Sequence, residues 1–371
     1  MGSGNKKLLL GTVALGLLGL LIYRSRNMLH LGDFSGGKLW GAIRGAYLPD
    51  ILLALALVYG CYALRAMRWQ IFQKSLGKAE FGAIFRMTLA GFAAVFLLGR
   101  AGEPIRPLLL ARKGKIPVAD TFGIWVLERL FDAASTAVIA AVGLLVFTSQ
   151  EHTGDTASTL EKAARTTGTV LAVGVLGAVA FLVYLRLHGT ELVERRLQGW
   201  LAAHGWRASV ARIILGFIRG IQTIRSWRDL AEAVFLSAVH WYFVVMIYLF
   251  VSHGFGGKLA QLSVSDCMLV TAFTLVGSAV QLPGVGGGSQ VACFLAYTTI
   301  FGVEKEPAAA AAILLWLITF ASCSLTGIPF LVHEGFSLGK LREIAEQEKE
   351  ELAEVAARGL KSTGRGGESD N

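Results

Sequence analysis

The chain has 371 residues, of which 54% are hydrophobic and 16% charged, and its mean hydropathy is +0.57. Soluble proteins carry about a quarter of charged residues, so this balance excludes an ordinary water-soluble domain. The formal net charge is +9, but no nucleic-acid motif or aromatic–basic platform accompanies it, and basic loops of a membrane protein explain it adequately.

Long apolar segments, taken in chain order, predict helices that cross a membrane. A bilayer core about 30 Å thick needs roughly 20 apolar residues of helix. Six segments approach or exceed this length, at residues 8–23, 48–64, 122–147, 168–187, 230–251 and 307–332. The first follows two lysines as a signal peptide would, but no small-x-small cleavage site comes after it, so we interpret it as an uncleaved anchor.

Three further apolar segments, at residues 81–98, 265–282 and 291–302, are interrupted by glycine and proline and read as half-helices. The interruptions are Gly-Arg-Ala-Gly-Glu-Pro at 99–104 and Pro-Gly-Val-Gly-Gly-Gly at 283–288. Tight helix packing would explain an isolated glycine such as Gly143. It explains the second run poorly, because an intact helix loses about 1 kcal/mol for each Gly and about 3 kcal/mol for Pro. We therefore predict breaks at both places.

The distribution of Lys and Arg predicts which connections face the cytoplasm. Residues 186–228 hold eight arginines, and residues 65–78 and 112–115 are also basic, so these stretches are expected inside. Residues 150–165 hold three acids and two cations, and residues 253–263 hold a single lysine, so both connections are expected outside. The basic residues at 24–44 conflict with this scheme, which places the first connection outside.

Following these sides along the chain predicts that residues 81–112 leave the cytoplasmic face and return to it. Residues 265–302 are expected to do the same from the opposite face. Two oppositely directed re-entrant hairpins are typical of an inverted-repeat transporter, in which broken helices meet near the midplane. Irregular backbone at that depth requires a cover of protein or a water-filled cavity, so a cavity is implied.

The expected fold is therefore an all-α polytopic membrane protein with about six full spans, two oppositely directed re-entrant helical hairpins and a possible inverted repeat. Residues 1–46 form an anchor helix and first connection, residues 47–335 the transmembrane domain, and residues 336–371 a charged cytoplasmic tail. The expected location is a bacterial inner membrane, with both termini in the cytoplasm.

Charged residues inside an apolar segment are the strongest functional signal. Glu128, Arg129 and Asp132 interrupt the segment at 122–147, and the two acids share one helix face. A charge at the bilayer centre costs about 2.5 to 3.5 kcal/mol, so these side chains need partners or water. Residues of the first break are the expected partners.

Arg100 and Arg106 bracket Glu103 at that break, where a helix N-terminus beside two arginines would form an anion site suited to phosphate. We expect Arg129 to pair with Glu103, leaving Arg100 and Arg106 partly free for substrate. The alternative is an ion-pair cluster that only fastens two helices together.

The second break is expected to complete this substrate site, because backbone amides beside glycines can approach a headgroup directly. The residues of the second break that we expect to bind substrate are Gln281, Pro283, Gly284, Gly286, Gly287, Gly288 and Gln290.

No catalytic, metal or cofactor motif emerges from the sequence. Four cysteines are scattered singly without a CxxC pair or a nearby histidine at ligand spacing, so we expect no metal and no cofactor. His240 and His333 are isolated, and neither a nucleophile elbow nor a phosphate-cradling loop is present.

Several of these features occur together in one known family. Arg68-Trp69, Gly99-Arg100-Ala101-Gly102-Glu103 with Arg106, the Glu-Arg-Leu-Phe-Asp run at 128–132 and Pro283-Gly284 resemble the lysylphosphatidylglycerol synthase transmembrane family. The resemblance covers about residues 51–332, in the family's order and at its spacing. This family is the flippase-like membrane module also found in bacterial multiple peptide resistance factors. The resemblance implies lipid translocation or a related step in lipid or glycolipid handling, with Arg68 and Trp69 at the cytoplasmic interface.

Two residues depart from the family's pattern. Leu98 stands where the family often has Pro, and Gln290 stands where a Glu commonly follows the second break. A role of that Glu in proton coupling or headgroup binding would be lost here. Members that synthesise aminoacylated lipid carry a large soluble catalytic domain, for which the tail at 340–371 is too short.

Three classes of function remain open from the sequence. The leading one is a transporter that moves an anionic or glycosylated lipid between leaflets, with a membrane phospholipid or lipid-linked molecule as substrate. The second is a lipid-modifying enzyme that uses Glu103, Glu128 and Asp132 as acid and base. The third is a membrane partner of a lipid or glycan synthase, and a homo-oligomer is also possible. The basic stretch at 196–228 could dock such a synthase, although its amphipathic character favours a position on anionic lipid headgroups.

Overall fold

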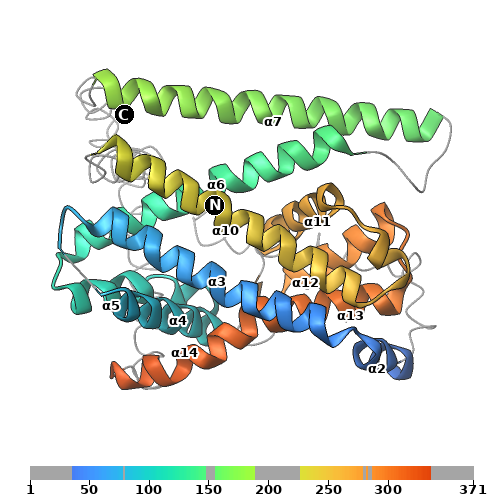
Figure 1. The fold of residues 1–371 in the computed structure, drawn as a ribbon, viewed down its shortest axis with the longest axis horizontal. Coiled ribbons are helices and arrows are strands. Elements are labelled where there is room, and N and C mark those ends of the chain that lie inside the picture. The colour runs from blue at the N-terminus through green and yellow to red at the C-terminus, as the bar shows by residue number, and fades with distance from the viewer. Residues whose placement is uncertain are drawn as a thin grey trace, which may run out of the picture.

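A computed structural model describes residues 36–77, 80–147, 155–188, 226–278, 281–282 and 286–335. The expected anchor helix at 8–23, most of the basic connection at 186–228 and the tail at 336–371 lie outside the described residues. Within them the chain is nearly all helical (Figure 1).

The first part of the described chain contains six α-helices and one short 3-10 turn. They are α2 (Gly36–Gly45), α3 (Leu48–Gln73), α4 (Phe81–Leu98), η2 (Gly99–Gly102), α5 (Ile105–Gly114), α6 (Val118–Val146) and α7 (Asp155–His188).

The second part is also helical, apart from two strands of two residues each. Its elements are α10 (Trp227–Gly254), η3 (Gly257–Gln261), α11 (Val264–Gly277), β1 (Gln281–Leu282), β2 (Gly286–Gly287), α12 (Gly288–Leu295), the π-helical turn η4 (Ala296–Ile300), α13 (Lys305–Trp316), the π-helical turn η5 (Leu317–Ala321) and α14 (Ser322–His333).

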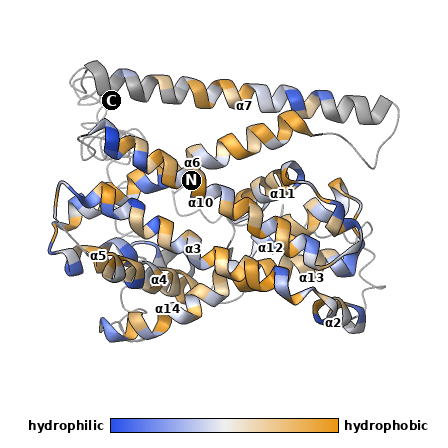
Figure 2. Ribbon diagram, in the orientation of Figure 1, coloured by the Kyte–Doolittle hydropathy of each residue, from blue (hydrophilic) through white to orange (hydrophobic). Residues whose placement is uncertain are grey.

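Five helices in the described residues are long and apolar enough to cross a membrane. They are α3, α4, residues Asp120–Val146 of α6, α10, and the continuous helix Lys305–His333 that α13, η5 and α14 form together. Hydrophobic residues line these helices, and hydrophilic residues gather towards their ends (Figure 2). This confirms the predicted class, a polytopic all-α membrane protein.

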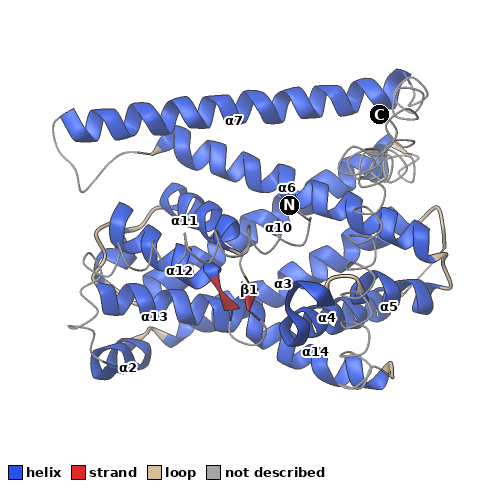
Figure 3. Ribbon diagram, turned by 180° about the vertical axis from the view of Figure 1, so that it is seen from behind, coloured by secondary structure: helices blue, strands red, loops and turns tan. Residues whose placement is uncertain are grey.

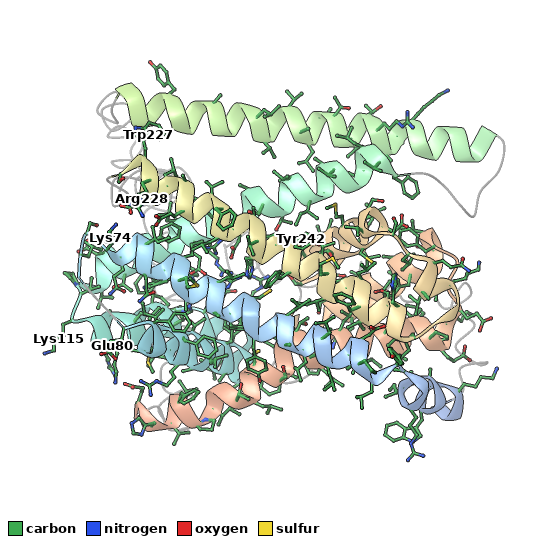
Figure 4. The ribbon with its side chains drawn as sticks, in the orientation of Figure 1. Lys74, Glu80, Lys115, Trp227, Arg228 and Tyr242 are labelled. Carbon is green, nitrogen blue, oxygen red and sulfur yellow. The ribbon has the colours of Figure 1, made fainter. Side chains whose placement is uncertain are left out.

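Helices α3 and α10 form an antiparallel pair that defines two ends of the molecule. At one end, the Lys74 Nζ atom lies 2.7 Å from Asp229 Oδ1. At the other end, the backbone N–H of Tyr47 donates to the carbonyl of Gly254 at 2.7 Å. We call these the Lys74 end and the Gly254 end. Figure 4 places Lys115 and Arg228 at the Lys74 end as well.

A first helical hairpin begins at the Lys74 end. Helix α4 runs from there towards the middle of the molecule, η2 reverses the chain, and α5 returns along α4. Gly91 of α4 contacts the side chain of Arg106, and Gly102 contacts the backbone of Ala94, so a β-carbon at either glycine would collide with its neighbour. Gly99 begins the turn with φ +65°, a conformation that glycine adopts at no steric cost.

A second helical hairpin begins at the Gly254 end and runs in the opposite direction. Helix α11 packs against α12 through Gly277, whose missing side chain leaves space for Gly288 and Ala292. Between them, β1 and β2 pair antiparallel, with Gln281 opposite Gly287. Figure 3 shows this small ladder in the middle of the molecule.

Each hairpin packs against a long helix from the other half of the chain. Gly327 of α14 lies against the carbonyl group of Leu89 in α4. Gly143 of α6 lies against the backbone of Leu269 in α11. A β-carbon added at Gly143 would be 3.1 Å from the backbone nitrogen of Leu269. The order of long helix, hairpin and long helix therefore occurs twice, in opposite directions.

Helix α4 is longer than the sequence analysis predicted. The segment at 81–98 was expected to be a half-helix, yet α4 has 18 residues, about 27 Å at 1.5 Å per residue. It is therefore long enough to be a span by itself, whereas α5, α11 and α12 are shorter.

Candidate functional site

The centre of the molecule holds two arginines from α3 that face two acids from α6. Arg65 and Arg68 are three residues apart, and Glu128 and Asp132 are four apart, so each pair occupies one face of its helix. Arg65 Nη1 lies 3.0 Å from both Glu128 Oε1 and Asp132 Oδ2. Arg68 Nη2 lies 2.6 Å from Asp132 Oδ1 and 3.4 Å from Glu128 Oε1.

Two further arginines join this group from α5 and α6. Arg106 Nη1 lies 2.8 Å from Glu128 Oε2, close enough for an ion pair although it is not aligned for a hydrogen bond. Arg129 Nη2 lies 3.2 Å from Asp132 Oδ2. We call these six residues the charge cluster: Arg65, Arg68, Arg106, Glu128, Arg129 and Asp132.

Most of the charge cluster is removed from solvent. The side chains of Arg68 and Glu128 are each 1% exposed, and only that of Arg129, at 41%, is substantially open. A buried charge is stable only when it is paired and hydrogen-bonded. The cluster therefore fastens α3, α5 and α6 together.

The charges of the cluster do not balance. Four arginines face two carboxylates, which leaves an excess of two positive charges in this group of described residues. Four donors of the cluster also lack a protein acceptor within the described part of the chain, namely Arg68 Nε, Arg106 Nε and Nη2, and Arg129 Nε. The cluster can therefore bind an additional anion.

His240 of α10 lies beside the cluster and adds no charge to it in this arrangement. Its Nε2 atom is 3.4 Å from Arg65 Nη2, and its Nδ1 atom is 3.2 Å from the carbonyl oxygen of Cys61. Since Arg65 can only donate, Nε2 acts as the acceptor, and Nδ1–H donates to the carbonyl. This is the pattern of a neutral imidazole.

A cavity of about 450 Å³ opens against the cluster and reaches both hairpins. Its charged wall consists of Arg65, Arg100, Glu103, Arg106 and Arg129. Its neutral polar wall comes from the second half of the chain, through Thr274, Ser278, Ser289, Gln290 and Thr319. Much of the remaining lining is aromatic, including Tyr62, Trp125, Trp241, Tyr248, Trp316 and Phe320.

The tips of the two hairpins meet at this cavity. Arg100 in η2 donates from Nη2 to the carbonyl oxygen of Ser278 at 3.1 Å, just beyond the end of α11. Its Nη1 atom lies 3.4 Å from Glu103 Oε1. The first break and the second half of the chain thus share one polar space.

The pairing inside the cluster differs from the expected one. Arg129 pairs with Asp132 and not with Glu103, while Glu103 pairs with Arg100. Arg106, expected to stay partly free, is held by Glu128, though two of its nitrogens lack a partner among the described residues. Arg129 and Asp132 are three residues apart on α6, about one helical turn, so the carboxylate of Asp132 lies within reach of the Arg129 guanidinium.

Arg68 and Trp69, expected at the cytoplasmic interface, lie in the last two turns of α3 and are packed inside the protein, each only 1% exposed. Trp69 lies beneath the guanidinium of Arg106, whose Cζ is 5.0 Å from the ring centroid. The sequence analysis assigned Arg65 to a basic stretch and Arg68 to the interface, and it linked neither of these arginines to the acids of α6. Their spacing on an apolar helix was the available signal.

The second break is described in part. Gln281, Gly286 and Gly287 form the strand ladder, and Gly288 begins α12. Gln290 lines the cavity, and its Oε1 atom accepts from the backbone N–H of Gly287. Of the predicted site, Pro283 and Gly284 lie outside the described residues.

The fold and the site together define a multi-pass helical membrane protein with a basic, aromatic-lined cavity between two opposed hairpins. Sequence comparison gives its family. The sequence model of the family described as lysylphosphatidylglycerol synthase TM region matches residues 8–327. The chain belongs to this family.

The chain is also similar to a protein named glycosyltransferase AglD from Haloferax volcanii. The two are 26% identical over 253 residues, which cover 62% of this chain and 38% of that protein. The chain thus matches little more than a third of the length of this relative.

Proposed function

We propose that the protein is a lipid transporter that moves an anionic or glycosylated lipid between the leaflets of a bacterial inner membrane. The observation that carries this proposal is the cavity, which combines a surplus of arginine with aromatic walls at the meeting point of two hairpins. A phospholipid matches this combination of a charged and an apolar wall, since its headgroup is anionic and its tails are apolar.

The volume of the cavity fits a headgroup and not a whole lipid. About 450 Å³ corresponds to roughly 15 water molecules at about 30 Å³ each. It also lies in the range of roughly 300 to 1,000 Å³ that small-molecule sites occupy. The acyl tails would therefore remain in the bilayer while the headgroup enters the protein.

In the proposed mechanism, the hairpins α4–α5 and α11–α12 are re-entrant, and the cavity lies near the midplane. Rocking of one half of the chain against the other would open the cavity to each leaflet in turn. Arg100 would break and remake its bond to Ser278 during this movement, because the two residues belong to different halves. The Lys74 end would face the cytoplasm, since its lysines and arginines follow the positive-inside rule.

Lipid movement can be tested with the purified protein in liposomes. The transfer rate of a fluorescent anionic phospholipid between leaflets is measured by quenching the accessible leaflet. We expect faster transfer than in empty liposomes. In Arg100→Ala the transfer rate should fall about ten- to a hundredfold, because hydrogen bonds from this guanidinium to a charged headgroup are worth roughly 1.5 to 3 kcal/mol.

The matched control is Arg86→Ala on α4, because Arg86 is exposed and does not line the cavity. This variant should retain the transfer rate. Equal loss in both variants, with folded protein in each, would contradict a headgroup site at Arg100.

A membrane partner of a lipid or glycan synthase is the second candidate. The similarity to part of a longer protein named a glycosyltransferase favours it. Co-purification with a synthase, combined with no lipid transfer by the isolated chain, would select this function over transport.

A further inference from the structure

We infer that the cavity recognises a doubly charged phosphate, such as a phosphomonoester or pyrophosphate at the head of a lipid, in preference to a singly charged phosphodiester. The inference rests on the proposed lipid function and narrows its substrate class. It follows from the charge balance and from the unpaired donors of the charge cluster.

The charge balance sets the number of negative charges that the ligand should bring. The cluster holds four arginines and two carboxylates, while Arg100 and Glu103 compensate each other and His240 is neutral in its hydrogen-bonding pattern. An excess of two positive charges remains. A phosphomonoester carries about −1.5 to −2 charges at neutral pH, whereas a phosphodiester carries one.

The donors beside the cavity suit phosphate oxygens, and since they are themselves buried, a ligand would reach them once their side chains turn towards the cavity. Arg106 is 4% exposed, lines the cavity and has no protein acceptor within the described residues for Nε and Nη2. These two nitrogens stand on one edge of the guanidinium, the fork that binds two oxygens of one phosphate. Its other terminal nitrogen, Nη1, faces Glu128 at 2.8 Å.

Two neighbouring groups extend this set of donors. Arg129 and Trp241 line the same cavity. Among the described residues, neither Arg129 Nε nor the buried indole Nε1 of Trp241 has an acceptor. Unmade hydrogen bonds of buried donors are costly, so a ligand that supplies several acceptors gains affinity from them. A terminal phosphate offers more unsubstituted oxygens than a diester does.

The test is equilibrium binding to the purified full chain in detergent. The probes are short-chain phosphatidic acid as the monoester, short-chain phosphatidylglycerol as the diester, and inorganic phosphate. At roughly pH 8 we expect the monoester to bind about ten- to a hundredfold more tightly than the diester, as expected for additional charge-assisted hydrogen bonds. At about pH 5, below the second pKa of the monoester near 6, this preference should disappear.

The diester also controls for titration of the protein itself. Groups that face the site include Arg65 and Arg68 from α3, Glu128 and Asp132 from α6, His240 from α10, and the pair Arg100 and Glu103 at the first break. Between about pH 8 and pH 5 these groups can only gain protons, which adds positive charge to the site and would raise the preference for the monoester. A fall in the ratio of the two affinities therefore reports the charge of the ligand.

Replacing one arginine of the charge cluster by a neutral residue should lower the preference for the monoester over the diester. Arg129→Gln lowers the excess to one charge and removes a half-exposed residue, so the fold should persist and the monoester-to-diester ratio should fall. Arg112→Gln is the matched control, because Arg112 is exposed on α5 and lies outside the cavity lining. Its ratio should equal that of the original protein.

Equal affinity for both lipids, a ratio that does not change with pH, or absence of binding by either lipid would overturn the inference. Equal affinities together with measurable transfer in liposomes would leave the proposed transport function intact. Inorganic phosphate that binds as tightly as phosphatidic acid would support the dianion site but assign it to a soluble phosphate, which contradicts the lipid function.

Discussion

Arg68 is the most deeply buried cation of the charge cluster, and it connects three helices. Its side chain is 1% exposed and contacts Asp132 at 2.6 Å, and its Nη1 donates to Ser237 Oγ at 2.9 Å. Replacement by an apolar side chain removes the donors to Asp132 Oδ1 and Ser237 Oγ, although Arg65 and Arg129 still face Asp132. We expect Arg68→Met to lower the free energy of unfolding by about 1.5 to 3 kcal/mol, the usual contribution of buried hydrogen bonds to a charged group.

Unfolding in detergent by heat or denaturant measures this effect, with Lys74→Met as control. Lys74 forms an ion pair with Asp229, but its side chain is 67% exposed, and such pairs contribute about 0 to 1 kcal/mol. A similar loss in the two variants would show that burial does not govern the stability of these pairs.

At the level of single residues, the sequence predicted the acids of the site better than their partners. Glu128 and Asp132 stand out because they interrupt an apolar helix, and the structure places both in the charge cluster. Arg65 and Arg68 follow an apolar segment, where hydropathy and the positive-inside rule both read them as a loop. Helix α3 continues to Gln73, and its packing against α6 and α10 turns these arginines inward.

At the level of elements, close backbone contacts at glycine hold the hairpins in place. Gly327 of α14 lies so close to the Leu89 carbonyl of α4 that an added β-carbon would overlap with backbone atoms, which cannot move aside as a side chain can. We expect Gly327→Ala to destabilise the protein by about 1 to 3 kcal/mol, as overpacking does. Thermal unfolding in detergent measures the loss.

Gly174→Ala serves as the control for this substitution. Gly174 also lies within a long helix, α7, but an added β-carbon there has no neighbour within 4 Å. Alanine favours a helix by up to about 1 kcal/mol relative to glycine, so the control should be neutral or slightly stabilising. Destabilisation of equal size at both positions would contradict the packing argument.

The breaks were predictable from composition, while the lengths of the helices around them were not. Glycine at positions with positive φ, such as Gly99 at +65° and Gly287 at +128°, marks where the chain departs from a helix. Hydropathy does not reveal how far the preceding helix extends, so α4 was expected to be shorter than its 18 residues. The π-helical turns η4 and η5 also have no clear signal in the sequence.

At the level of the whole molecule, the Lys74 and Gly254 ends should lie on opposite sides of the membrane. Ser75 and Ala260 are exposed at these two ends, and the four native cysteines are buried and should react slowly. We expect Ser75→Cys to be labelled only from the cytoplasm and Ala260→Cys only from outside. An impermeant maleimide, applied to cells and to inverted vesicles, distinguishes the two sides.

Labelling of both positions from the same side would contradict the proposed topology and with it the opposed entry of the hairpins. Labelling with the sides exchanged would keep the architecture but reverse the orientation expected from the basic residues.

The unequal charge of the two halves has an electrical consequence for the proposed transport cycle. The excess positive charge belongs to α3, α5 and α6, whereas the second half contributes mainly neutral groups to the cavity. A bound dianion would cancel this excess, so the loaded site would move through the membrane field nearly without net charge. The empty site would carry two charges, each worth about 2.3 kcal/mol for a full passage through 100 mV.

The return of the empty protein is therefore the step that should respond to membrane voltage. In liposomes with an imposed potassium diffusion potential, we expect the transfer rate to rise for one polarity and to fall for the other. A rate that is the same at both polarities would show that the arginines stay fixed in the field, and that the mobile half is the one without them.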